Sequence, residues 1–208
     1  MPRYHYITNF EEDVKSYGYI RQYLRVYDEK DIILFSSYNK DEFKILSNFH
    51  QSSKPLPWMG KQFNSAEAML FYSYFSYFIN DPKLEKEKQS ALQFIIESGY
   101  GKEVKNNELV QKLYGGMKKK VIKELGNEGW DLTDWEIACK IIKVKYEYCP
   151  EFRELVNANK DKFFCENCFW ENIPKPGVLK VTDKNSPYFG KYVGCNISGL
   201  AIQRCLTL

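Results

Sequence analysis

The distribution of apolar residues predicts one buried strand near the start of the chain. The run DIILFSS at residues 31–37 is β-branched and apolar, which is typical of a buried strand. The preceding stretch, residues 17–29, mixes tyrosines with charged residues and fits either a strand or a short helix. Residues 51–60 contain two prolines and a glycine, so they predict a loop.

The segment after this loop predicts a helix that is apolar around most of its circumference. Asn64 or Ser65 is a suitable N-cap, and Glu67 places a carboxylate in the first turn, where it suits the helix dipole. Six of the eight residues from Phe71 to Phe78 are aromatic. We therefore expect this helix to be central to the core.

Glycines and prolines divide the rest of the chain into further helices. The pattern predicts a helix from Asp81-Pro82 to the glycines at 99 and 101, one over 107–125, one capped by Thr133 or Asp134 and ending before Pro150, a short one at 151–159, and a last one starting near Asn196. Gly126 and Gly129 interrupt the helical pattern between the second and third of these. The expected fold class is mainly α (α+β), a single compact helical domain with a small β element near the N-terminus.

Composition and charge narrow the class of protein. The 208 residues are 44% hydrophobic, which can fill one sizeable core, and a net charge of +3 excludes a histone-like nucleic-acid binder. No apolar run approaches the roughly 20 residues that span a bilayer, and the N-terminal MPRYHYITNFEED lacks the apolar part of a signal peptide. The expectation is a soluble, cytoplasmic protein without membrane contact.

The cysteines predict free thiols rather than disulfides. All six fall within residues 139–208 of a chain for which we expect a reducing environment. Cys165 and Cys168 form a C-x-x-C pair, which is half of a zinc site, but no second close pair follows and the two histidines lie far upstream. We therefore expect no metal and no cofactor.

Familiar catalytic motifs are missing, which leaves carboxylates, tyrosines and lysines for acid–base chemistry. The sequence has no phosphate-binding G-x-x-x-x-G-K-S/T loop, no G-x-G-x-x-G, no H-E-x-x-H and no G-x-S-x-G. Glu67 is the leading candidate; the alternative is that it only neutralises the helix dipole. Lys145 lies late in an apolar helix and as an alternative extends to solvent. The tryptophans at 58, 130, 135 and 170 either stack a base or belong to the core, and Lys118–Lys120 either contact phosphates or form a solvated face.

Five short motifs in order give the chain a resemblance to a known family. They are ILSNF at 45–49, FNSAE at 63–67, KY at 145–146, N-x-F-W at 167–170 and G-x-N-x-x-G at 194–199. This order resembles the NADAR family. The resemblance covers about residues 31–206, which implies an N-terminal extension at 1–30 and a NADAR-like domain at 31–208. Asn167 replaces the family's usual Asp and Glu171 its usual Gly, which suggests a divergent branch resembling phage-encoded relatives that would act in the host cytoplasm.

The resemblance implies an N-glycosidase that cleaves the C1′–N bond of a ribosylated base. The substrate would be ADP-ribosyl-guanine in nucleic acid or a phosphoribosyl aminopyrimidine of riboflavin synthesis. Glu67 would stabilise the cationic ribose or activate water, and Lys145 would form a Schiff base in an alternative route. The implied substrate-binding residues are Asn48, Trp58, Trp135, Asn167, Trp170, Gly194 and Asn196, with Gly199 beside the last helix. The alternatives are a catalytically inactive ADP-ribose- or nucleotide-binding module that serves as adaptor or counter-defence protein, and a purely structural interaction domain.

Overall fold

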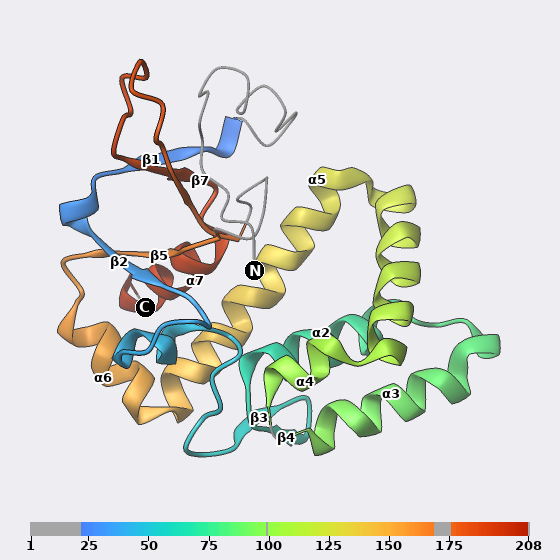
Figure 1. Cartoon of the computed structure of the whole chain (residues 1–208). Coiled ribbons are helices and arrows are strands. Elements are labelled where there is room, and N and C mark those ends of the chain that lie inside the picture. Colours follow the sequence, from blue (N-terminus) through green and yellow to red (C-terminus); the bar gives the residue numbers. More distant parts are fainter. Residues whose placement is uncertain (1–21, 99, 169–175, 208) are drawn as a thin grey trace. The chain divides into compact units, whose positions relative to one another are not determined.

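The computed structural model describes residues 22–98, 100–168 and 176–207 of the chain (Figure 1). Its described part is mainly α with some β, as the sequence predicted. The chain divides into two compact units, one formed by residues 1–44 and 155–208 and the other by residues 45–154. Two elements cross the borders between them, the 3-10 helix η3 (Glu42–Leu46) and α6 (Pro150–Ala158).

The first unit is built from two small sheets and a helix. Its elements are β1 (Arg25–Tyr27), η2 (Glu29–Asp31), β2 (Ile32–Phe35), β5 (Phe163–Glu166), β6 (Leu179–Lys180), β7 (Tyr192–Gly194), α7 (Ile197–Arg204) and η5 (Cys205–Thr207). Strand β7 pairs antiparallel with both β1 and β6, and β2 pairs parallel with β5. Strands near the start of the chain thus pair with strands near its end.

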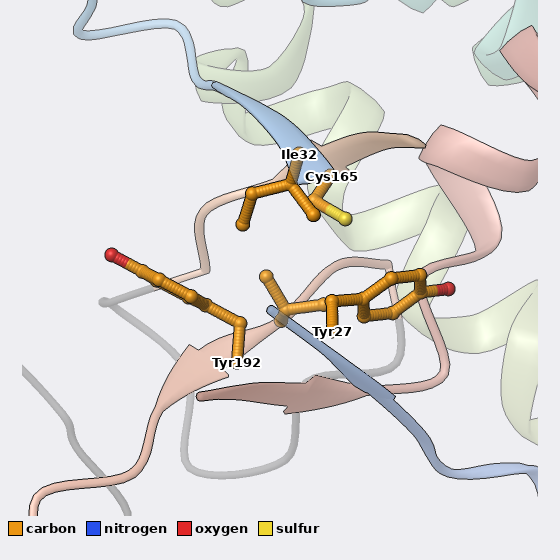
Figure 2. Packing of buried hydrophobic residues seen from close by; sticks show 5 residues of the cluster. Tyr27, Ile32, Cys165 and Tyr192 are labelled. Carbon is orange, nitrogen blue, oxygen red and sulfur yellow. The ribbon is translucent and has the colours of Figure 1, made fainter. Parts of the chain in front are cut away.

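A small core holds these strands together. Tyr27, Ile32, Cys165, Val178 and Tyr192 form one buried cluster. Figure 2 shows Tyr27, Ile32, Cys165 and Tyr192 on separate strands of this cluster. The predicted strand over 31–37 is confirmed as β2, and burial of Ile32 agrees with its apolar pattern. Of the residues 17–29, for which the sequence left strand and short helix open, Arg25–Tyr27 form β1 and Glu29 begins η2. The predicted boundary after residue 30 stays a prediction.

The second unit is helical and is organised around α2 (Ala66–Phe78). Its other elements are the strands β3 (Leu56–Trp58) and β4 (Lys61–Phe63), the 3-10 helix η4 (Pro82–Leu84), and the helices α3 (Glu85–Glu97), α4 (Gly101–Asn106) and α5 (Glu108–Tyr148). Helix α2 contacts α3, α4 and α5. The predicted cap is confirmed, because Ser65 Oγ accepts a hydrogen bond from the Ala68 amide at 3.3 Å.

Two local predictions for this unit are wrong. Residues 51–60 are not wholly a loop, because β3 and β4 form a hairpin whose two turn residues, Met59 and Gly60, have φ angles of 48° and 73°. Positive φ at both positions matches the twist of an antiparallel pair. Thr133 and Asp134 do not cap a new helix, since α5 continues through them and Thr133 Oγ1 donates to the Gly129 carbonyl within the helix.

Helix α5 is interrupted at Gly126, one of the two glycines at which the sequence predicted a break. Gly126 has φ 75° and ψ 172°, a backbone conformation that is essentially restricted to glycine. Figure 1 shows the resulting bend between the two arms of α5. The structure confirms that a helix, α5, ends before Pro150 and that a short helix, α6, follows it. Helix α7 confirms the last predicted helix.

Within the described residues, no helix combines the length and the apolar character that crossing a membrane requires. All six cysteines are free thiols, as predicted, and five of them are buried.

Candidate functional site

Both predicted catalytic residues are attached to one short segment, residues 45–49, which we call the 45–49 segment. Lys145 Nζ donates to the Ile45 carbonyl at 2.7 Å and to the Ser47 carbonyl at 2.8 Å. The Glu67 amide donates to the Asn48 carbonyl at 2.9 Å. The structure thus joins the motifs at 45–49 and 63–67 to the distant motif at 145–146, all within the 45–154 unit.

Lys145 is enclosed by the protein. Its side chain is 0% exposed, and Nζ lies 4.6 Å from the centroid of the Phe152 ring. Two carbonyl oxygens and an aromatic face thus surround Nζ. The alternative that this lysine extends to solvent is therefore wrong.

Glu67 lies half-buried in the first turn of α2, and its surroundings are tightly packed. A Cβ atom placed on Gly101, the first residue of α4, would lie 2.9 Å from Glu67 Cβ, 2.9 Å from Ser65 Oγ and 3.2 Å from the Phe49 Cα. Only glycine allows this close approach of α4 to the start of α2. The close packing of α4 consequently fixes the backbone and Cβ of Glu67.

The face of α2 that carries Glu67 also carries Tyr74, seven residues later. Tyr74 is buried, and its hydroxyl donates a short hydrogen bond to Asp134 on α5. Burial raises the pKa of Tyr74 well above its usual value, and the negative charges of Asp134 and Glu67 raise it further. Two carboxylates thus lie near one buried hydroxyl, which stays protonated and donates.

Sequence reasoning missed this pair. Tyr74 was counted only among the aromatic residues, and Asp134 only as a helix cap. The seven-residue spacing from Glu67 to Tyr74 is the signal that identifies the face, because helix positions i, i+4 and i+7 lie on one side. The partner on α5 has no such signal, since it lies 60 residues from Tyr74.

An aromatic cluster surrounds the Tyr74 ring. The Trp130 ring lies 5.4 Å from Tyr74 and 6.3 Å from Tyr114, and its side chain is only 3% exposed. Trp130 therefore belongs to the core and not to a base-stacking surface. Lys118 Nζ lies 5.7 Å from the Tyr114 centroid and 5.6 Å from the Trp130 centroid, so it contacts rings rather than forming only a solvated face.

The two remaining tryptophans of this unit are both half-buried. Trp58 lies on β3, where its Nε1 donates to Ser73 Oγ at 2.8 Å, and Ser73 Oγ in turn donates to the Met69 carbonyl at 2.7 Å. Its indole is thereby tied to α2. Trp135 lies within α5. A substrate-stacking role for either residue stays a prediction.

The other predicted binding residues lie in the unit formed by 1–44 and 155–208. The Asn167 amide donates to the Phe35 carbonyl at 2.8 Å, which continues the pairing of β2 and β5. Gly194 ends β7, and a Cβ there would lie 2.0 Å from the Gly177 carbonyl oxygen. Trp170 and Glu171 lie outside the described residues.

Asn196 joins three parts of this unit. Its side chain is 1% exposed, and Nδ2 donates to the Phe164 carbonyl at 2.8 Å and to the Tyr27 hydroxyl at 3.2 Å. Its φ of 55° and ψ of 41° place it in the left-handed region, which asparagine tolerates. The Asn196 and Ser198 amides donate to the Gly177 and Pro176 carbonyls, so these two amides at the start of α7 are engaged within the fold.

Both cysteines of the C-x-x-C pair are buried, and burial keeps the Cys165 thiol protonated. Cys165 and Cys168 are both 0% exposed. Burial raises the pKa of Cys165 to about 12, although a hydrogen bond from Asn196 Nδ2 partly opposes the rise. A thiol in this state is a poor metal ligand. No group of three or more His, Cys, Asp or Glu side chains with metal-binding geometry occurs in the described ranges of the chain.

Glu151, in the first turn of α6, fixes the loop that follows the 45–49 segment. Its carboxylate accepts from the Ser53 amide at 3.0 Å and from Ser53 Oγ at 2.8 Å. Burial alone raises the pKa of Glu151, but the hydrogen bonds from Ser53 and the residue's own amide outweigh it and lower the pKa to about 2.

This depressed pKa predicts a defined acid response. Because the folded pKa lies below the unfolded value, the carboxylate stabilises the fold above about pH 4.3 and loses that effect as pH falls towards 2. We expect the difference in unfolding free energy between the wild type and Glu151→Gln to shrink from pH 6 to pH 2, measured by urea denaturation. Glu154→Gln, at an exposed position of the same helix, serves as control. A difference that is constant with pH would contradict the assignment.

Comparison with protein-family models and with curated proteins finds no match for this chain. The resemblance to NADAR proteins therefore depends on the five short motifs and their order.

Proposed function

We propose that this chain is an N-glycosidase that hydrolyses the C1′–N bond of a ribosylated base, either ADP-ribosyl-guanine in nucleic acid or a phosphoribosyl aminopyrimidine. The observation that carries the proposal is the attachment of both Glu67 and Lys145 to the 45–49 segment. Three of the five motifs thus belong to one local arrangement, although more than 90 residues separate Lys145 from its carbonyl partners.

Glu67 supplies the carboxylate in this proposal. As the C1′–N bond breaks, its electron pair leaves with the base nitrogen, which takes up a proton, and the ribose develops positive charge at C1′. A carboxylate facing C1′ stabilises that charge and accepts a proton from the attacking water, whose oxygen forms the new bond. Glu67 is half-buried, which suits this role. The electrostatic field of a partly buried carboxylate is stronger than that of one in bulk water, and a side chain that is not fully buried leaves room for a substrate to approach.

Lys145 acts as a positioning residue on the hydrolytic route. Its ammonium group holds the Ile45 and Ser47 carbonyls, which orients the 45–49 segment and with it the Asn48 carbonyl that binds the Glu67 amide. In the Schiff-base route the ribose ring opens to an imine between C1′ and the base nitrogen. The Lys145 amine, having given up a proton, adds to C1′ and leaves the Ile45 and Ser47 carbonyls to do so; the C1′–N bond to the base then breaks and the base nitrogen departs with a proton. Water hydrolyses the remaining lysine imine, which frees the amine and the ribosyl product.

The decisive experiment measures release of the ribosyl product. The protein is incubated with an oligonucleotide bearing ADP-ribosyl-guanine and, separately, with a ribosylaminopyrimidine phosphate, and free ADP-ribose or ribose phosphate is quantified. We expect release from one substrate and a loss of at least about 100-fold in Glu67→Gln. The control is Glu85→Gln, which removes a carboxylate from the first turn of α3 and should leave the rate unchanged.

Three further outcomes have distinct meanings. Equal release by Glu67→Gln and the wild type would refute the catalytic assignment. Binding of either compound without release supports the alternative, a nucleotide-binding module without activity. Borohydride treatment of the wild-type reaction distinguishes the routes, because an adduct located at Lys145 by peptide mass assigns the Schiff base, and its absence with continued release leaves the hydrolytic route.

A further inference from the structure

A hollow lies between the end of α2 and the first arm of α5, and none of the residues that line it belongs to the 45–49 segment. We call it the Gly116 pocket, and its volume is about 370 Å³, at the lower end of the range for small-molecule sites. The residues that line it are Phe78, Ile79, Asn80, Asp81, Leu84, Lys112, Leu113, Gly116, Met117 and Lys120. None of them has a part in the proposed glycosidase reaction.

One face of α5 forms the wall of this pocket. Leu113 and Met117 are buried and lie one turn apart, while Lys112 and Lys120 mark the two ends of the same face. Gly116 lies midway between the lysines, and a Cβ atom placed on it would meet nothing within 4 Å. The glycine therefore leaves open a space that a larger side chain would occupy.

The opposite wall is also apolar, and its polar groups are already engaged. Ile79 is buried, and its carbonyl at the end of α2 accepts from Lys88 Nζ at 2.8 Å. The Asp81 carboxylate accepts from the Lys83 amide at 2.9 Å, where it caps η4. These polar atoms already have hydrogen-bond partners within the protein. A ligand would therefore contact this wall through its apolar side chains.

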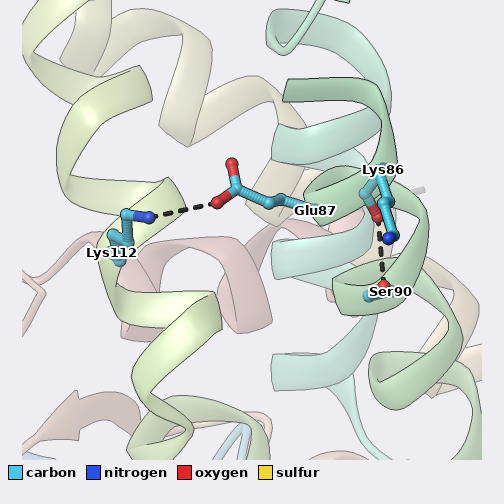
Figure 3. Close-up of polar contacts among 4 residues, drawn as sticks. All are labelled: Lys86, Glu87, Ser90 and Lys112. Atoms are coloured by element: carbon cyan, nitrogen blue, oxygen red, sulfur yellow. Dashed lines mark hydrogen bonds and ion pairs between the residues drawn. The ribbon is translucent and has the colours of Figure 1, made fainter. Parts of the chain in front are cut away.

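Two lysines, Lys112 and Lys120, and one carboxylate, Asp81, line the pocket. Lys112 pairs with Glu87 of α3 at 3.1 Å, an exposed ion pair that Figure 3 shows between the two helices. Within the parts of the chain that the structure describes, no carboxylate lies within ion-pair distance of Lys120, whose side chain is exposed. An apolar hollow beside an unpaired ammonium group complements a molecule with an apolar body and one anionic end.

We propose that the Gly116 pocket binds a medium-chain carboxylate, with its alkyl chain against Leu113 and Met117 and its carboxylate at Lys120. Decanoate is the probe, and decanol and decylamine are its uncharged and cationic counterparts. The site is independent of the glycosidase proposal, because its lining residues are not attached to the 45–49 segment and its test requires no turnover.

The four methionines make the test direct. In protein labelled with ¹³C at the methionine methyl groups, decanoate is expected to shift the Met117 signal in a saturable way and to leave Met59, exposed in the hairpin turn, and Met69, buried in α2, unchanged. Decanol should bind about 2- to 5-fold more weakly than decanoate, and Lys120→Gln should remove that difference. Decylamine should bind more weakly than either.

A matched pair of glycine variants locates the site. Gly116→Leu fills the hollow and is expected to weaken decanoate binding at least about tenfold, whereas Gly115→Leu, at the neighbouring position that does not line the pocket, should bind as the wild type does. If Gly116→Leu does not fold, the test is the decanoate titration of the Met117 signal, compared between the wild type and Lys120→Gln. An unmoved Met117 signal, wild-type binding by Gly116→Leu, or equal affinity for decanoate and decanol would each overturn the proposal. Self-association of the chain that decanoate does not affect, and that Gly116→Leu abolishes, would overturn it in favour of a second copy as occupant.

Discussion

Replacing Gly199 with alanine is expected to lower the free energy of unfolding by about 3 kcal/mol or more, although alanine normally stabilises a helix interior. A Cβ atom at this position in α7 would lie 1.8 Å from the Phe164 carbonyl oxygen and 2.5 Å from Asn196 Oδ1. Neither atom belongs to a flexible side-chain end, because the Asn196 amide group is itself hydrogen-bonded to Phe164. Relief of the clash therefore requires α7 to move away from β5.

Gly115→Ala is the matched control for this prediction. Gly115 also lies inside a helix, but a Cβ there meets nothing within 4 Å. Alanine at position 115 should therefore stabilise the protein by up to about 1 kcal/mol through helix propensity alone. Urea denaturation of both variants measures the two effects, and stabilisation by Gly199→Ala similar to that by Gly115→Ala would show that α7 does not pack on β5 as closely as the structure has it.

Replacing Lys145 with methionine is expected to lower the free energy of unfolding by about 3 kcal/mol. Methionine keeps most of the apolar volume but donates no hydrogen bond, so the Ile45 and Ser47 carbonyls lose the group that binds them. Because the lysine side chain is fully buried, its hydrogen bonds to these carbonyls are made away from bulk water, and removal of the donor leaves the carbonyls unsatisfied. The loss should appear as a lower urea midpoint with an unchanged slope.

Lys143→Met, at an exposed position two residues earlier in α5, is the control and should change the stability by no more than about 0.5 kcal/mol. If the two variants were equally stable, Lys145 would not anchor the 45–49 segment. In that case the main support for joining Glu67 and Lys145 in one site would be lost as well, which makes this measurement informative about the proposed function before any substrate is tested.

Part of the candidate site was predictable from the sequence, and part was not. The motifs identified Glu67 and Lys145, and the helix pattern placed them on α2 and α5. The partners of Lys145 were not predictable, since they are backbone carbonyls about 100 residues away and carry no residue-type signal. The Tyr74 and Asp134 hydrogen bond was missed for the same reason.

For the fold, the sequence by itself determined the features that depend on neighbouring residues. Ser65 caps α2 because its hydroxyl reaches the amide of Ala68, three residues later, and Gly126 bends α5 because only glycine adopts its backbone angles readily. The tertiary structure alone decided the pairing of β2 with β5, because register between strands more than 120 residues apart depends on which surfaces the whole chain buries together. It also decided that Lys145 is enclosed and hydrogen-bonded to carbonyls, because the spacing of apolar residues cannot distinguish a buried, partnered lysine from one that extends to solvent.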